Sequence, residues 1–187
     1  MIRVFFDTET TGLPSSHDAP PEQYPRLCQL AFLVYQDEKK IIEASLIVKP
    51  EGFIIPAEVA AIHGITQEKA EAEGLPLADV LGIFKDFLNM SSGGIEIIAN
   101  NLEYDRKVIS GEFFRIMGAY PSFDKIKTFC TMREGSIFLK TLKYPKLKEI
   151  YAALFGAEFQ GQHNALNDVR ACARVYFEMK RRNEAIK

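Results

Sequence analysis

The sequence lacks the features that mark several classes of protein. Its 187 residues hold no apolar run long enough to span a membrane. Its three cysteines have neither the spacing of a disulfide framework nor that of a metal site, so a reducing, cytoplasmic compartment is expected. It shows no repeat and no linker, and because it opens directly on strand-like residues no signal peptide is predicted. We therefore expect a single domain over residues 1–187, without a membrane partner.

A strong charge of either sign is also missing. The chain has 23 Lys and Arg against 25 Asp and Glu, a formal net charge of -2, which neither favours nor excludes nucleic acid as a partner. One local basic cluster stands out, formed by Lys140, Lys143, Lys146 and Lys148 with Tyr144 among them. This cluster could follow a phosphate backbone, or it could be a solvated lysine face.

The order of the predicted elements indicates an α/β fold. Apolar runs predict a buried N-terminal strand followed by strands at 26–36 and 41–48, joined as an antiparallel meander. Later strands are expected at 95–99 and 125–131, and they alternate with helices. The predicted helices are 56–73, in two pieces broken at Gly64, and 76–90, 102–117, 145–155 and 165–182. A meander followed by this alternation predicts a five-stranded mixed sheet flanked by helices.

Two acids end the first strand. In Val4-Phe5-Phe6-Asp7-Thr8-Glu9 the apolar run leads into Asp7 and Glu9, which are two residues apart and therefore point to the same face. Like charges held together repel, and desolvation strengthens that repulsion. The arrangement suits a divalent cation such as magnesium between the two carboxylates. A strand end with two solvated acids would give the same pattern.

Two further acids lie on apolar stripes of helices. Val108 and Ile109 follow Asp105 at +3 and +4, and Ala171 and Cys172 follow Asp168 in the same way. A buried carboxylate needs a cationic partner or a metal. Each acid could instead be a helix N-terminal charge that the dipole favours. Together with the acid pair on the strand, they favour a metal site.

Histidine could supply the proton transfer that such a site needs. His163 comes five residues before Asp168, just ahead of the last predicted helix, and its ordinary pKa lies near neutrality. His17 lies in a polar loop and is expected to be incidental. His63 has no assignment on physical grounds alone.

Three motifs in order carry a family resemblance: Asp7-x-Glu9, Asn101-x-x-x-Asp105 and His163-x-Ala165-x-x-Asp168. They resemble the motifs of the DEDD exonucleases, and the histidine spacing resembles the DEDDh branch, which includes the proofreading epsilon subunit of bacterial DNA polymerase III. The motifs span nearly the whole chain. The resemblance implies a ribonuclease H-like fold and removal of nucleotides from a 3′ end as nucleoside 5′-monophosphates.

The resemblance also implies a mechanism with two divalent ions, magnesium or manganese. Asp7, Glu9 and Asp168 would hold the ion that activates water, Asp7 and Asp105 would serve the second ion, and His163 would be the general base. The residues that the resemblance assigns to the substrate are Thr8, Thr10, Leu13, Ile62, His63 and Asn101. Of these, Leu13 and Ile62 would pack against the terminal bases.

The chain departs from the family pattern in two places. Asn100 stands where the family often has histidine, and Cys130-Thr131 stands where the last strand usually leads to Asp-Thr. Neither change removes a proposed ligand. The chain also ends soon after its last predicted helix, without the segment that tethers the bacterial proofreading subunit. A stand-alone exonuclease, or one recruited by another surface, is therefore expected.

The sequence leaves more than one function open. The leading interpretation is a metal-dependent 3′-5′ exonuclease acting on single-stranded DNA, in proofreading or repair, with a DNA polymerase as a candidate partner. A second is the same chemistry on RNA ends or short oligoribonucleotides, since contacts to a 2′-hydroxyl cannot be seen in a sequence. A third, of another class, is a non-catalytic nucleic-acid-binding or polymerase-associated module.

Overall fold

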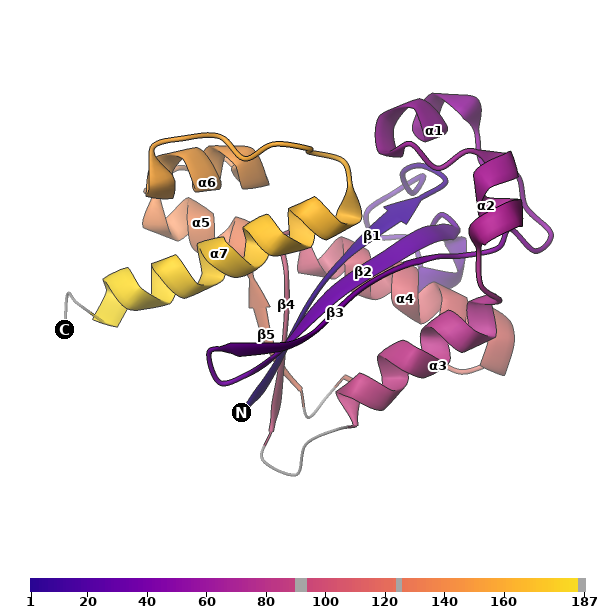
Figure 1. The fold of residues 1–187 in the computed structure, drawn as a ribbon, viewed down its shortest axis with the longest axis horizontal. Coiled ribbons are helices and arrows are strands. Elements are labelled where there is room, and N and C mark those ends of the chain that lie inside the picture. Colours follow the sequence, from indigo (N-terminus) through magenta and orange to yellow (C-terminus); the bar gives the residue numbers. More distant parts are fainter. Residues whose placement is uncertain (90–93, 124–125, 185–187) are drawn as a thin grey trace.

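A five-stranded sheet forms the centre of the computed structural model, which describes residues 1–89, 94–123 and 126–184 (Figure 1). The strands are β1 (Ile2–Thr10), β2 (Leu27–Gln36), β3 (Lys39–Ile47), β4 (Ile95–Ala99) and β5 (Lys127–Cys130). Their order is β3-β2-β1-β4-β5. β1 to β3 form an antiparallel meander, and β4 and β5 run parallel to β1. The predicted α/β class with a five-stranded mixed sheet is thus confirmed.

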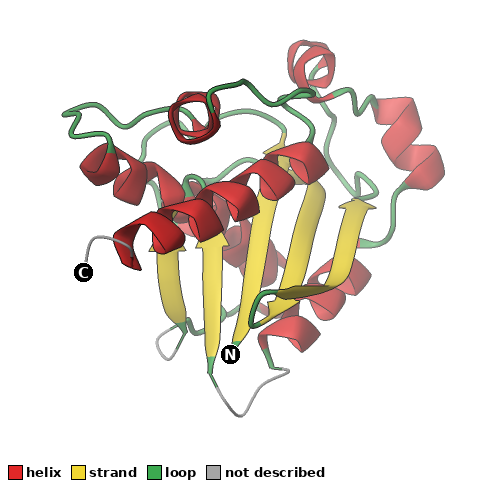
Figure 2. Cartoon of the chain, turned by 60° about the vertical axis from the view of Figure 1, so that its left-hand side comes forward, coloured by secondary structure: helices red, strands yellow, loops and turns green. Residues whose placement is uncertain are grey.

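Helices cover both faces of this sheet. They are α1 (Ala57–His63), α2 (Gln67–Glu73), α3 (Leu77–Leu88), α4 (Leu102–Met117), α5 (Thr131–Phe138), α6 (Leu147–Phe155) and α7 (Ala165–Glu184), with a 3-10 turn at Pro21–Gln23. Figure 2 shows α7, which leads to the C-terminus, crossing one face while other helices lie behind the strands. None of the described helices combines the length and the apolar character that crossing a membrane requires.

Consecutive side chains of β1 pack into the two hydrophobic core layers on opposite faces of the sheet. Phe6 packs with Phe84 in the layer that includes α3 and α4, whereas Phe5 packs with Tyr176 in the layer under α7. This follows from the alternation of side chains along a strand. Asp7 and Glu9 therefore continue the Phe5 side, toward α7.

Among the described residues, the C-terminal end of β1 has no partner on the side of β4. β1 pairs with β2 along nearly its whole length, but its last partner in β4 is Ile98, opposite Phe5. Asp7 and Glu9 thus extend beyond the end of β4. Ligands in open α/β sheets bind beyond the carboxyl ends of the strands, and this is such a position.

The sequence predicted most elements to within a few residues. The break between α1 and α2 falls at Gly64, whose φ of 75° is left-handed. The helix α5 was missed, because Cys130 gives it no side-chain cap and Gly135 stands inside it. That glycine has a packing role: a Cβ there would come within 2.6 Å of Ile150 Cδ1 on α6. The predicted helix end at residue 90 and strand start at residue 125 lie outside the described residues.

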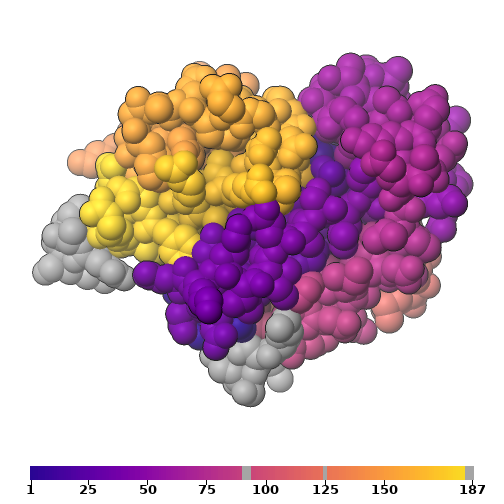
Figure 3. Space-filling model, in the orientation of Figure 1, coloured from indigo at the N-terminus to yellow at the C-terminus, as the bar shows by residue number. Residues whose placement is uncertain are grey.

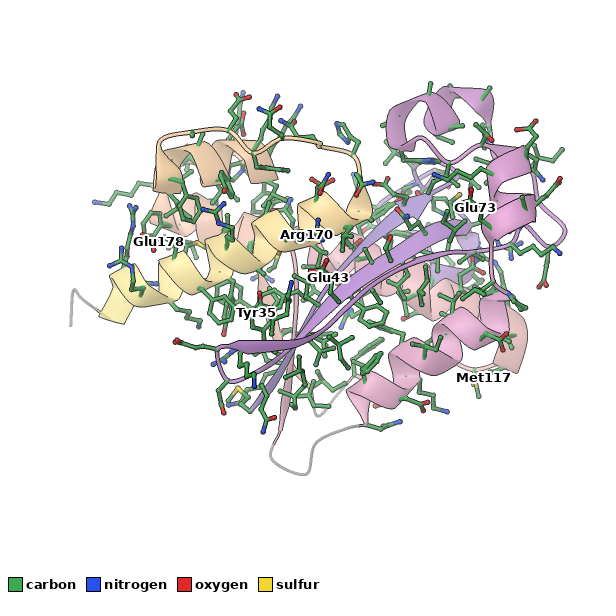
Figure 4. The ribbon with its side chains drawn as sticks, viewed as in Figure 1. Tyr35, Glu43, Glu73, Met117, Arg170 and Glu178 are labelled. Atoms are coloured by element: carbon green, nitrogen blue, oxygen red, sulfur yellow. The ribbon has the colours of Figure 1, made fainter. Side chains whose placement is uncertain are left out.

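An ion pair joins α7 to the edge of the sheet. In Figure 4 Arg170 of α7 points toward Glu43 of β3. Hydrogen bonds from Arg170 and then from Lys40 lower the pKa of Glu43 to about 2. Because the pair is solvent-exposed it orients α7 over the meander and adds little to stability.

A buried carboxylate anchors α4 to the start of β2. Glu112 is fully buried, and its Oε1 accepts hydrogen bonds from Arg26 Nε (3.0 Å) and from the backbone N–H of Leu27 (2.8 Å). Arg115 forms a second ion pair with it and also donates to the carbonyl of Tyr24. The loop between β1 and β2 is thereby held against α4, the helix that carries Asp105.

We expect Glu112→Ala to lower the free energy of unfolding by about 3 kcal/mol, because it leaves the Arg26 guanidinium without its buried partner. The measurement is urea unfolding. The matched control is Glu103→Ala on the same helix, since the ion pair of Glu103 with Arg106 is exposed and its loss should cost far less. Equal losses in the two variants would contradict the anchoring role.

Candidate active site

Three carboxylates meet at the end of β1. Asp7 and Glu9 share the face of the strand that lies under α7, and Asp168 stands in the first turn of α7. One oxygen atom from each of the three lies within 4.8 Å of the other two. The structure thus brings together three acids that are up to 161 positions apart in the sequence, counting from Asp7 to Asp168.

The turn before α7 fixes Asp168 and places His163 beside it. The backbone N–H of His163 donates to Asp168 Oδ2 (2.9 Å), and Asn164 Oδ1 accepts from the N–H of Asn167 as a helix cap. His163 has a φ of 62°, which is uncommon for a residue other than glycine. Its exposed side chain lines a cavity of about 370 Å³ together with Asp7 and Asp168. The histidine and the carboxylates therefore face the same space.

Burial raises the pKa of every carboxylate in this group, and the charges of neighbouring acids raise the pKa of Asp7 and Glu9 further. Burial, followed by the charges of Asp168 and Asp105, raises the pKa of Glu9 to about 7, and burial raises that of Asp168 to about 6. The pKa of Asp7 is raised well above its usual value by burial and then by Asp105, Asp168 and Glu9. A cation held among the acids would relieve this repulsion. A donor set of carboxylate oxygens suits a hard divalent ion.

The fourth predicted acid sits deeper. Asp105, on the first turn of α4, is only 4% exposed, and its Oδ1 accepts hydrogen bonds from the N–H (3.1 Å) and the Oγ1 (2.7 Å) of Thr8. Burial raises its pKa to about 7 against the lowering effect of those bonds. Asp105 does not belong to the three-carboxylate group, although its charge is the largest electrostatic influence on Asp7. Thr8, predicted to contact substrate, donates both of the hydrogen bonds that orient Asp105.

Sequence reasoning missed Tyr104, which shapes the loop after β1. Its hydroxyl oxygen lies 2.6 Å from Thr10 Oγ1 and 2.9 Å from the carbonyl oxygen of Gly12, and Thr10 Oγ1 lies 2.8 Å from the same carbonyl, so the two hydroxyl protons are shared among these three oxygens. The hydroxyl of Thr10, also predicted to contact substrate, is thus engaged within the protein. The only signal in the sequence was that Tyr104 directly precedes Asp105.

The two apolar residues predicted to contact the bases are exposed, and neither is among the residues that line the cavity of Asp7. Leu13 follows this loop and is 85% exposed, and Ile62 on α1 is 58% exposed. Figure 3 shows the surface hollowed between the purple segment of α1 and the orange segment that leads into α7. His63 beside Ile62 is buried, accepts the N–H of Ile65 at Nδ1 (3.1 Å), and has its pKa lowered by burial. We therefore regard His63 as a neutral group that shapes this wall.

The opposite wall is polar and basic. Asn101, Tyr144, Lys146 and Lys148 line the same cavity as Asp7. In the sequence, residues 140–148 form one basic cluster, but in the structure only part of this cluster lines the cavity. Lys146 and Lys148 face the cavity, whereas the more distant lysines of the cluster are exposed and are not among the residues that line it.

Comparisons with known proteins agree with this geometry. The model of a family described as Exonuclease (RNase_T) matches residues 4–176. A search among curated proteins found no match.

Among solved structures, the zinc-bound complex of E. coli exonuclease I with single-stranded DNA has a TM-score of 0.78 at 21% identity, over 97% of this chain and 40% of that one. The complex of E. coli exonuclease I with a dA16 oligonucleotide gives 0.79 at 20% identity, over 98% and 42%. Exonuclease I from Methylocaldum szegediense gives 0.72 at 22% identity, over 97% and 40%. The likeness establishes the ribonuclease H-like fold, and the chain spans about 40% of the length of these exonucleases.

The raised pKa values predict an unusual pH dependence in metal-free protein. The folded carboxyls of Glu9, Asp105 and Asp168 keep their protons to about pH 6 or 7, whereas unfolded ones lose them near pH 4. Folding therefore binds protons in this interval, and the free energy of unfolding should fall as the pH rises from about 4 to about 7. Urea unfolding in EDTA across this range is the measurement.

Glu9→Gln should flatten this dependence, because it removes one of the titrating groups and part of the repulsion. Manganese added at the upper end of the range should restore stability to the native chain. A pH profile that is the same in the variant and the native chain would show that the acids do not interact.

Proposed function

The chain belongs to the exonuclease family whose model spans residues 4–176, and from this premise we propose that it removes nucleotides one at a time from the 3′ end of single-stranded DNA. The products would be nucleoside 5′-monophosphates. The observation that carries the proposal is the convergence of the carboxylates of Asp7, Glu9 and Asp168 beside one open cavity, which Asp7, Asp168 and His163 line. The similar fold of E. coli exonuclease I, whose structure holds a dA16 oligonucleotide, supports single-stranded DNA as the substrate.

The carboxylates would hold two divalent ions, magnesium or manganese. Asp7, Glu9 and Asp168 form the donor set for one, since their oxygens already converge. Asp7 and Asp105 would serve the other, and both hydrogen bonds that Thr8 donates end on Oδ1 of Asp105 and not on Oδ2. Such ions, when bound, lower the pKa of water and stabilise the charge that develops on the phosphate.

His163 would act as the general base. Its imidazole is exposed to the cavity that Asp7 and Asp168 line, so it can accept a proton from the attacking water. The hydrogen bond from its backbone N–H to Asp168 holds this loop in place and does not involve the imidazole.

Leu13 and Ile62 would contact the last bases of the strand. Exposed apolar side chains at the rim can stack on or wedge between bases of any sequence. A paired end must fray before it reaches them, at a cost of a few kcal/mol. Mismatched 3′ ends would then be degraded faster than matched ones. This preference fits a cytoplasmic role in proofreading or repair, with a DNA polymerase as the partner.

The test is a time course on a 5′-labelled oligonucleotide with magnesium or manganese, as a single strand, a matched duplex, a duplex with a mismatched 3′ end, and the RNA equivalent. We expect a ladder of products that shorten from the 3′ end, fastest on the single strand and slowest on the matched duplex. Faster cleavage of RNA would indicate an exoribonuclease instead.

Asp7→Asn should abolish this activity, because it removes a charge shared by both ions. Asp79→Asn, an exposed acid on α3, is the matched control and should keep it. Binding without cleavage in the native chain would indicate the non-catalytic module, and internal cuts would contradict an exonuclease.

A second experiment separates the roles of His163 and Asp168. His163→Ala should lose roughly 100- to 10,000-fold in rate, the usual worth of general-base catalysis, while the rise in melting temperature on adding manganese is retained. Asp168→Ala should lose both the rate and most of that rise, because it removes a donor. If His163→Ala also lost the response to manganese, the histidine would be a ligand.

A further inference from the structure

The cavity at the carboxylates continues into a larger one. Asn101, Met132 and Tyr144 line both the cavity of about 370 Å³ that contains Asp7 and a second cavity of about 990 Å³. The second cavity runs from the first turns of α4 to β5 and α5. The two form one groove, open at the carboxylates and leading away from α1.

The near part of this groove carries unpaired positive charge. In the described part of the chain, neither Lys146 nor Lys148 forms an ion pair with a carboxylate, although both line the cavity of Asp7. The larger cavity is lined by two acids, Glu103 and Glu134, and by two arginines, Arg106 and Arg133, and Glu103 is paired with Arg106. Its charges are therefore mixed, whereas the two unpaired lysines near the reacting end can hold a phosphate.

An aromatic ring stands at the junction of the two cavities. Tyr144 is 63% exposed although it is a large apolar side chain, and in the described residues no ring contact or hydrogen bond of its side chain is found. A free aromatic face beside unpaired lysines is the usual composition of a single-strand binding groove, since bases stack on the ring while cations neutralise the phosphates.

We propose that this groove binds the part of a DNA single strand that lies on the 5′ side of the scissile phosphate, with a base stacked on Tyr144 and a phosphate held by Lys146. The inference rests on the proposed function. It predicts that the enzyme prefers strands longer than two nucleotides as substrates. The terminal base would lie on the other side of the carboxylates, against Leu13 and Ile62. One wall would then contact the strand on the 5′ side of the scissile bond, and the other would contact the nucleotide on its 3′ side.

The groove can be tested without disturbing the fold. The cap of α6 uses the backbone N–H of Lys146, which donates to Glu149 Oε2 (2.7 Å), so Lys146→Ala keeps that bond. Matched controls come from the same loop: Leu142→Ala for Tyr144→Ala, and Lys143→Ala for Lys146→Ala. Both control side chains are exposed, and neither is among the residues that line the two cavities.

The experiment compares kcat and KM for a dT12 strand and for a dT2 dinucleotide. Tyr144→Ala should raise KM for dT12 by roughly 5- to 100-fold, the equivalent of one lost base stack, with a smaller change for dT2. Lys146→Ala should make the slope of log kcat/KM against log salt shallower by about 0.7 for dT12, the value for one single-strand phosphate contact. The two control variants should behave as the native chain.

Two results would overturn the groove: equal losses on dT12 and dT2, which would place Tyr144 at the terminal base, or losses as large in the control variants. Binding of fluorescent dT12 to the chain with calcium in place of magnesium gives a second readout that does not need turnover. If the native chain bound dT12 but cleaved nothing, the proposed function would fail while weaker binding by Tyr144→Ala would still support the groove. Equal binding by the variant and the native chain would refute the groove alone.

Discussion

The crowding of carboxylates at the end of β1 is the constraint on which the rest of the structure depends. Burial raises the pKa of Asp7, Glu9 and Asp168, and repulsion from neighbouring carboxylates raises the pKa of Asp7 and Glu9 further. Such a cluster opposes folding unless something else holds the chain in place. The sheet does so by keeping β1 at its centre, paired with β2 along nearly all of its length. Asp7 and Glu9 are thus set on the central strand of the sheet.

Both helical layers contribute an acid, and they do so in different ways. Asp168 reaches the site from α7, on the face that Phe5 buries. Asp105 comes from α4 in the other layer and is tied to the edge of β1 through Thr8. A small shift between the layers would separate the two acids. The buried pairing of Glu112 with Arg26, which locks α4 against the start of β2, therefore has a consequence for the site as well as for stability.

The part of the site that follows from local periodicity could be predicted from the sequence. Alternation along a strand was enough to place Asp7 and Glu9 on one face, and the apolar residues three and four positions after Asp105 placed it on the buried stripe of its helix. The partner of Asp105 could not be predicted, because its bond to Thr8 spans 97 positions and depends on how α4 crosses the strand. The ion pair of Arg170 with Glu43 in Figure 4 is tertiary in the same sense.

The basic cluster shows a second limit of sequence reasoning. The four lysines of the cluster look equivalent in the sequence, yet of these four only Lys146 and Lys148 line the cavity of Asp7. These two are the N-cap of α6 and a residue of its first turn, whereas Lys140 and Lys143 lie in the segment between α5 and α6. α5 was overlooked for a related reason, since Gly135 lowers its intrinsic helix propensity and is needed only because Ile150 packs against it.

The two walls of the site differ in chemistry, and this difference has a consequence for substrate selection. On one side exposed apolar side chains, Leu13 and Ile62, offer stacking but no charge; on the other, lysines and Tyr144 offer both. A uniform groove would accept a strand in either direction and at any point along it. An asymmetric one favours a single polarity, because a phosphate backbone that continued past the apolar rim would lose its cations there. In the proposed exonuclease, recognition of a strand end would thus arise from the two walls, while the carboxylates would contact only a phosphate and supply the chemistry.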